Sequence, residues 1–149
     1  MKSTLLALTF GLLATSAAVA QTTDTLAKIK NTGRVTMGVR ESSGLSFTLG
    51  NGVFTGFHVE TCQKVLEDVR KQLGLAKLDI VYQPVTSQNR IPLVQNGTVD
   101  IECGSTTNSA ARQKDVDFAV TTYVEEVRIA VKADSGIRSI AQLAGKTIA

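Results

Sequence analysis

Two kinds of hydrophobic pattern alternate along this chain, and that alternation restricts the folds open to it. Four short runs have the β-branched or apolar character of strands, with turn residues at their ends. The first of them alternates polar and apolar side chains, as a half-buried strand does. The predicted strands are residues 34–40, 79–85, 99–104 and 124–131.

Helical patterns lie between these strands. The clearest has apolar side chains at steps of three and four, ended by Gly74 as a C-cap, and comprises Val59, Cys62, Leu66, Val69 and Leu73. Shorter helices are expected at residues 25–30, within 86–95, at 110–114 and at 137–143. Residues 41–52 carry turn residues and predict a loop or a loose hairpin. Single helices between strands form βαβ units, so the predicted fold is α/β with a parallel sheet flanked by helices.

The N-terminus has the features of a secretory signal. Lys2 precedes an apolar stretch at residues 5–13, and small residues end the segment at Ala20. A transmembrane anchor is the alternative, but the apolar stretch is well short of the roughly 20 residues that span a bilayer. We therefore expect residues 1–20 to be a signal peptide cleaved after Ala20, and the mature chain to be exported to the periplasm.

Composition argues against several classes of function. Lys and Arg number 16 against 13 Asp and Glu, and aromatic residues make up 5% of the chain. Without a basic stripe or a stacking platform, no nucleic-acid partner is expected. The two cysteines of an exported chain favour a disulfide over metal binding, and His58 is the single histidine, so neither a metal nor a cofactor is expected.

Polar and cationic side chains follow three of the predicted strands. Arg40 ends the first, Ser87 follows the second, and Ser105 and Thr107 follow the third. Arg90 and Arg112 come just after two of these loops. Ligands of parallel sheets bind beyond the carboxyl ends of the strands, so these groups predict an anion site. Arginine pairs with both oxygens of a carboxylate, which suits a dicarboxylate amino acid, although solvated surface arginines remain the alternative.

Four stretches carry a resemblance to a known family. They are GVRESS at residues 38–43, VTSQNRIPLVQNGTVD at 85–100, ECGSTTN at 102–108, and Arg112-Gln113. The chain resembles the family 3 extracellular solute-binding proteins, which bind polar amino acids for ABC importers, and is most similar to the glutamate/aspartate-binding branch. It departs from the family pattern at residues 45–47 and at Ala111.

The resemblance implies a fold and a function. Members have two periplasmic-binding-protein-like (type II) lobes that close on the ligand. Residues 21–127 would form the first lobe, and 128–149 a crossover strand and the start of the second. The chain resembles an N-terminal fragment, truncated before the second lobe is complete, and we expect weak ligand binding or none from it alone. The implied partners of the whole protein, a monomer, are L-glutamate or L-aspartate and the membrane subunits of an ABC importer.

The resemblance also implies roles for individual residues. Ser105, Thr107 and Arg112 match positions that hold the amino acid's α-carboxylate. In the acidic branch, the positions of Arg40, Ser87 and Arg90 face the side-chain carboxylate.

The cysteines are also expected to pair. Cys62 lies on the apolar face of the long helix, and Cys103 ends the strand against which that helix should pack. A Cys62–Cys103 disulfide is expected, with two buried thiols as the alternative.

An enzyme on the same scaffold, similar to cyclohexadienyl dehydratase, is an alternative function, as is a sensory ligand-binding domain. Glu41 and Glu102 are the acidic residues nearest the predicted edge. A carboxylate beside an arginine is more often a charge partner than a catalytic acid, so we expect a binding protein and no enzyme.

Overall fold

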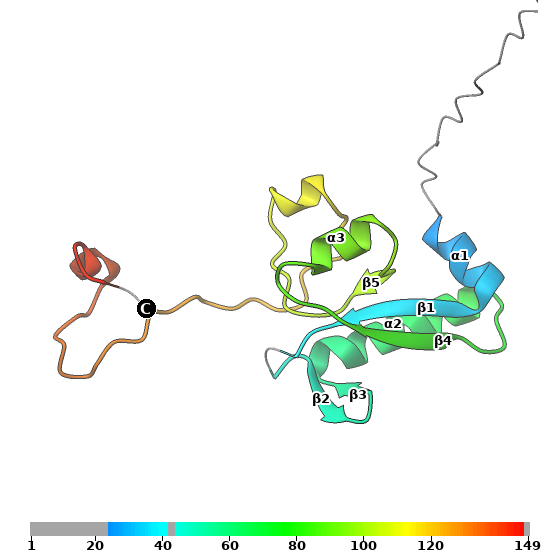
Figure 1. Cartoon of the computed structure of the whole chain (residues 1–149), viewed down its shortest axis with the longest axis horizontal. Coiled ribbons are helices and arrows are strands. Elements are labelled where there is room, and N and C mark those ends of the chain that lie inside the picture. Colours follow the sequence, from blue (N-terminus) through cyan, green and yellow to red (C-terminus); the bar gives the residue numbers. More distant parts are fainter. Residues whose placement is uncertain (1–23, 42–43, 148–149) are drawn as a thin grey trace, which may run out of the picture. The chain divides into compact units, whose positions relative to one another are not determined.

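The computed structural model describes residues 24–41 and 44–147 (Figure 1). The chain divides into two units, one ending at Val116 and the other beginning at Asp117, and each is described by itself. The predicted signal peptide and its cleavage site lie outside the described residues.

The first unit contains a parallel sheet, as the sequence predicts. The sheet has the order β4-β1-β5, formed by β1 (Arg34–Val39), β4 (Asp79–Pro84) and β5 (Ile101–Glu102). β1 pairs with β4 from Arg34↔Asp79 to Val39↔Pro84, and with β5 at Met37↔Ile101 and Gly38↔Glu102. The central strand is thus the first in the sequence, and all three strands end at the same edge.

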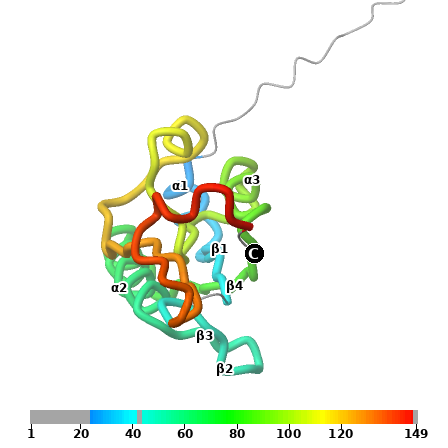
Figure 2. The backbone as a smooth tube through the Cα atoms, turned by 90° about the vertical axis from the view of Figure 1, so that its left-hand side faces the viewer, coloured from blue at the N-terminus to red at the C-terminus, as the bar shows by residue number. Residues whose placement is uncertain are grey.

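Helices cover both faces of this sheet. In Figure 2, β1 and β4 lie between α2 (Phe57–Gln72) and α3 (Arg90–Gln95). Between β1 and α2 the chain forms an antiparallel hairpin of β2 (Phe47–Gly50) and β3 (Val53–Thr55), so the hairpin that residues 41–52 suggested is confirmed, and its second strand lies just beyond that range.

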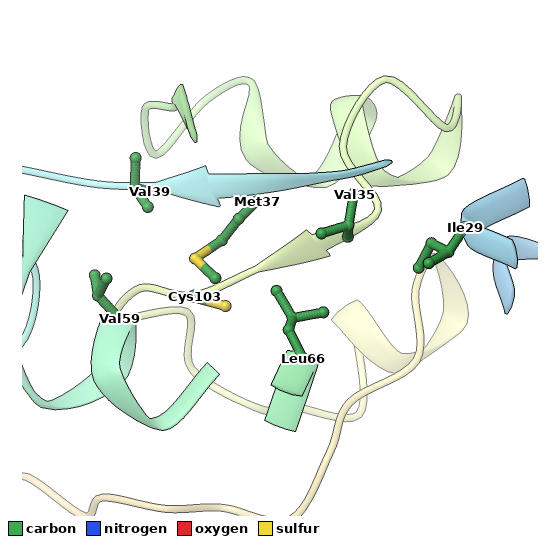
Figure 3. Packing of buried hydrophobic residues seen from close by; sticks show 7 residues of the cluster. All are labelled: Ile29, Val35, Met37, Val39, Val59, Leu66 and Cys103. Atoms are coloured by element: carbon green, nitrogen blue, oxygen red, sulfur yellow. The ribbon is translucent and has the colours of Figure 1, made fainter. Parts of the chain in front are cut away.

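The core lies between β1 and α2. Val35, Met37 and Val39 alternate along β1 and are buried against Val59 and Leu66 of α2 (Figure 3). A disulfide with an S–S distance of 2.09 Å joins Cys62 of α2 to Cys103, directly after β5, so this prediction is confirmed. Ile29 of α1 (Thr25–Thr32) and Cys103 complete the same cluster.

Glycines fix the entrance and exit of α2. Gly56 precedes the helix with φ 116°, and a Cβ there would lie 2.6 Å from the carbonyl oxygen of Leu45, so only glycine fits. Gly74, with φ 68°, follows the last turn, as the sequence predicts.

The helix α1 is tied to the sheet by a partly buried ion pair. Asp24 caps α1 by accepting from the backbone N–H groups of Leu26 and Ala27. The Nζ of Lys28 lies 2.8 Å from an Asp100 oxygen, and the other Asp100 oxygen accepts from the backbone N–H of Thr36. The side chain of Asp100 is 3% exposed, so this carboxylate joins α1, β1 and the start of β5.

Several predicted elements are shorter than expected. Residues 99–104 pair as a strand only at Ile101–Glu102, and residues 110–114 contain one 3-10 turn, Arg112–Lys114. In the second unit, residues 137–143 contain the 3-10 helix Ile140–Leu143.

The predicted strand at residues 124–131 is wrong. A strand needs a hydrogen-bonding neighbour, and no strand is assigned among the described residues of the second unit. Val127 is accordingly 98% exposed. Among residues 24–41 and 44–147, no helix is long and apolar enough to cross a membrane.

Candidate ligand-binding site

The carboxyl edge of the sheet gathers the predicted site residues of three strand ends. Arg40 follows β1, Thr86 follows β4 after Val85, and Gly104 follows β5 after Cys103. A Cβ on Gly104 would lie 3.4 Å from the Cβ of Arg40 and would collide with an oxygen of Glu102. The ends of β1 and β5 therefore lie close together, and a side chain at Gly104 would require the carboxylate of Glu102 to move.

Local hydrogen bonds fix the position of Arg90 at the start of α3. The backbone N–H of Thr86 donates to Oδ1 of Asn89 (2.7 Å), and the N–H of Asn89 donates to Oγ1 of Thr86 (3.2 Å). This reciprocal pair closes the turn that precedes α3, whose N-cap is Asn89. Pro92 lies in the first turn of the helix, where its missing N–H removes no helical bond. The loop after β4 thus begins α3 at a defined residue.

Arg90 is buried although its guanidinium is incompletely paired. The residue is 5% exposed, and its Nε and Nη1 atoms are buried with no hydrogen-bond partner in the described structure. A guanidinium stays charged in proteins, and an unsatisfied buried charge is costly. Such a group is suited to a carboxylate that arrives from outside.

The three predicted arginines share one electrostatic environment. Burial lowers the pKa of Arg90, the Glu102 carboxylate opposes that change, and the charges of Arg40 and Arg112 add to it. The charges of Arg40 and Arg112 therefore both act on Arg90, although 72 residues separate Arg40 from Arg112 in the sequence. Their role in ligand binding is a prediction that this placement supports.

The hydroxyl residues of the predicted site are more open to solvent. Ser87 is exposed in the loop before α3, Ser105 is half-buried after β5, and Thr107 is exposed. The Nη1 of Arg112, which is half-buried, donates to the carbonyl oxygen of Thr107 over 3.0 Å. Two of the three groups expected to bind the α-carboxylate are therefore in direct contact.

The sequence did not single out Thr106 as a contributor to this edge of the sheet. Thr106 donates its hydroxyl proton to Oε2 of Glu102 over 2.8 Å, while Oε1 of Glu102 is buried without a partner in the described structure. The sequence placed both residues at the strand end, but nothing in it showed that they pair.

A shallow depression elsewhere in the first unit has a different character. All of its lining residues lie on α2, and they carry charges of both signs: Glu60, Gln63, Lys64, Glu67, Asp68 and Lys71. No strand end reaches it, so it is not the candidate site. The described residues contain no group of three or more His, Cys, Asp or Glu side chains that could hold a metal ion.

An α/β lobe with a cationic cluster at the carboxyl edge of its parallel sheet defines a class of small-molecule-binding domains. Comparison with known sequences identifies the family. The chain belongs to the bacterial extracellular solute-binding proteins, family 3, whose sequence profile matches residues 35–143.

Two curated relatives are glutamate/aspartate-binding proteins. The chain is 44% identical to the L-glutamate/L-aspartate-binding protein of Pseudomonas aeruginosa, over 95% of this chain and 48% of that protein. It is 40% identical to the glutamate/aspartate import solute-binding protein of Escherichia coli, over 91% of this chain and 48% of that protein. The predicted resemblance is confirmed, and the chain spans about half the length of these relatives.

Solved structures support the fold. An ancestral cationic amino acid solute-binding protein matches with 30% identity and a TM-score of 0.54, over 64% of this chain and 39% of that one. A solute receptor for L-cysteine of Neisseria gonorrhoeae matches with 26% identity and a TM-score of 0.54, over 63% and 37%. The predicted periplasmic-binding-protein-like α/β fold is thereby confirmed.

Proposed function

We propose that this chain supplies the first lobe of the substrate-binding component of an ABC-type amino acid importer. The ligand is an acidic amino acid, L-glutamate or L-aspartate, held between two lobes. The observation that carries the proposal is the buried, incompletely paired guanidinium of Arg90, on which the charges of Arg40 and Arg112 also act.

The charge of the cluster favours a dicarboxylate. The charges that act on Arg90 are those of two further guanidinium groups, Arg40 and Arg112, and of one carboxylate, Glu102, so positive charges outnumber the negative one around it by two. An acidic amino acid brings two carboxylates, and each can pair with an arginine. A neutral amino acid would leave one of the two charges unpaired, which accounts for a preference for acidic ligands.

The two carboxylates are assigned to different parts of the edge. Arg112 and Thr107 are already in contact, and with Ser105 they form the proposed α-carboxylate site. Arg40, Ser87 and Arg90 follow β1 and β4, the other two strands, and form the proposed side-chain carboxylate site. The names of the Pseudomonas and Escherichia relatives support the same ligand class.

The remaining features of the proposal concern the whole protein. Residues 21–127 belong to the first lobe and residues 128–149 begin the second. The protein is exported to the periplasm and works as a monomer with the importer's membrane subunits. The extracellular description of the family and the Cys62–Cys103 disulfide support an oxidising compartment.

We propose binding and no catalysis. Of the two carboxylates considered for an enzyme, Glu41 is exposed, and Glu102 is engaged by Thr106. One related structure is described as an ancestral amino acid-binding protein that was a precursor of cyclohexadienyl dehydratase, so this scaffold has served both purposes.

Isothermal calorimetry tests the ligand class. The mature protein, expressed from its full-length gene, is titrated with L-glutamate, L-aspartate, L-glutamine and L-arginine. We expect tight binding, seen as a clear binding heat, with L-glutamate and L-aspartate, and little heat with L-glutamine and L-arginine. If an intact two-lobe protein gave no measurable binding heat with glutamate and aspartate, the proposal would be overturned. For the present chain alone we expect weak binding or none, and a micromolar constant would contradict that expectation.

Two arginine variants test the assignment within the site. Arg112→Ala should abolish binding of every amino acid, because loss of one partner of a buried ion pair costs about 3–5 kcal/mol. Arg90→Ala should instead reduce the preference for glutamate over glutamine. Arg34→Ala, at the opposite end of β1 and with an exposed side chain, is the matched control and should bind as the wild type does. Equal losses for glutamate and glutamine in Arg90→Ala would refute its assigned role.

A further inference from the structure

Glu102 lies on the same face of the sheet as α3. Its partner in the sheet is Gly38, and a Cβ on Gly38 would lie 3.5 Å from the Cγ of Glu102. The same Cβ would lie 3.4 Å from a methyl of Val85 and 3.0 Å from one of Val99. The stem of Glu102 therefore lies next to Gly38, on the same face as Val85 and Val99, which flank α3.

The opposite face holds the neighbouring residue. Cys103, next along the chain, is bonded to Cys62 of α2. Since successive residues of a strand point to opposite faces, the disulfide fixes which way Glu102 faces.

Glu102 and Arg90 are each half satisfied. One oxygen of Glu102 accepts from Thr106, and the other is buried without a partner in the described structure. Arg90 has two nitrogens in the same state. Glu102 is also the group whose charge favours the protonated form of Arg90, against the repulsion of Arg40 and Arg112.

We infer that Glu102 is a positioning residue for ligand binding: fixed by Thr106, its buried carboxylate makes no hydrogen bond to Arg90 but attracts the guanidinium by charge and keeps it at the carboxyl edge of the sheet. The inference rests on the proposed function, because the N–H groups so held are those that meet the ligand's side-chain carboxylate. Without Glu102, two like charges and the cost of burial would drive the guanidinium of Arg90 toward solvent.

The opposite role makes the opposite prediction. If Glu102 instead competed with the ligand for Arg90, its removal would strengthen the binding of glutamate. The sign of the change in affinity therefore distinguishes a positioning residue from a competitor.

The first experiment uses Glu102→Gln in the mature full-length protein. The variant keeps the shape and an oxygen that accepts from Thr106 but removes the charge. We expect the dissociation constant for L-glutamate to rise about tenfold, as for other closely coupled charged neighbours. The constant for L-glutamine should change by less than about twofold, since a neutral side chain does not depend on the charge of Arg90. Unchanged or tighter glutamate binding, or equal weakening for both ligands, would overturn the inference.

Glu41→Gln is the matched control. Glu41 is an exposed carboxylate directly after Arg40, and its removal changes the net charge by the same amount. We expect both dissociation constants to stay at their wild-type values. A tenfold loss in this control would show that net charge, and not the position of Glu102, explains the result.

A second measurement needs no ligand. Glu102→Gln should lower the melting temperature by about 3 °C in the wild type, because it leaves Arg90 without its counter-charge. The same change in an Arg90→Met background should have almost no effect, because the charge to be compensated is gone. Additive shifts would overturn the inference. If no amino acid binds the wild-type protein, the proposed function fails, yet this cycle still reports whether Glu102 holds Arg90.

Discussion

The two faces of the sheet differ in how their buried groups are satisfied. On the α2 face, Met37 of β1 packs on Val59 and Leu66, and a disulfide closes the cluster at the end of β5. On the α3 face, the same strands present Gly38 and Glu102, beside the incompletely paired Arg90. One face is apolar and closed, and the other holds buried charges that lack partners.

This difference separates stability from binding. Apolar burial is worth about 25 cal/mol per Å², whereas a buried charge without a full set of partners costs free energy. The α2 face therefore stabilises the lobe. That stability offsets the cost of burying the incompletely paired guanidinium of Arg90 on the α3 face, where an anion can bind it. The strand period of two is what allows adjacent residues such as Glu102 and Cys103 to serve these separate purposes.

Removal of the disulfide should have the largest effect on the α2 face. Cys62 and Cys103 are 41 residues apart in sequence, and closing a loop of that length is worth about 4 kcal/mol in the chain-entropy model. We expect the Cys62→Ala/Cys103→Ala variant to lose about that much stability in urea unfolding. Wild-type protein reduced with a phosphine should unfold at a similar midpoint. A midpoint equal to that of the oxidised wild type would contradict the proposed importance of this face.

A cavity on the α2 face should have the next largest effect. Leu66 is 3% exposed in the core cluster, and truncation of a buried leucine to alanine costs about 3 kcal/mol. Val65, next to it on α2, is 48% exposed and provides the control. Val65→Ala should change the free energy of unfolding by less than about 0.5 kcal/mol. Equal losses in the two variants would show that this helix does not bury one face against β1.

On the α3 face, the corresponding change should act in the opposite direction. The double variant Arg90→Met/Glu102→Met replaces both buried charges by apolar side chains of similar length. Replacement of both opposite charges of a buried pair by apolar groups is often neutral or stabilising by about 1 kcal/mol or more, whereas removal of only one leaves the other uncompensated. We expect a small rise in the unfolding midpoint together with loss of glutamate preference in calorimetry. A large destabilisation would show that Arg90 is a structural part of the core, which would remove the contrast between the faces.

The exposed surface of α2 should show the smallest effect. The guanidinium of Arg70 donates to Glu67 and lowers the pKa of that carboxyl below the ordinary value of 4.5. A lowered pKa means that the interaction stabilises the folded state above that value and is lost as the pH falls below it. Glu67→Gln should therefore lower the melting temperature slightly at neutral pH, and the difference from wild type should vanish in acid. A difference that persists in acid would point to packing rather than charge.

The local elements could largely be predicted from the sequence. The apolar steps of α2, its end at Gly74 and the alternation of β1 depend on near neighbours in the chain, and the structure confirms all three. The predicted strand at residues 124–131 failed because its composition shows apolar character but not whether another strand is present to pair with it. The pairing of Cys62 with Cys103 could be expected once a helix and a strand were placed, since both lay on faces that had to meet.

The sequence predicted the grouping of the arginines only through the general rule that ligands of a parallel sheet bind beyond the carboxyl ends of its strands. The sequence placed Arg40, Arg90 and Arg112 after secondary structure elements, and the parallel order β4-β1-β5 brought them to one edge. The contact between Thr106 and Glu102, the approach of the Glu102 stem to Gly38 and the ion pair of Lys28 with Asp100 were decided by the tertiary structure alone. Local periodicity is set by residues a few positions apart, whereas these contacts depend on how separate elements pack, which no short stretch of sequence encodes.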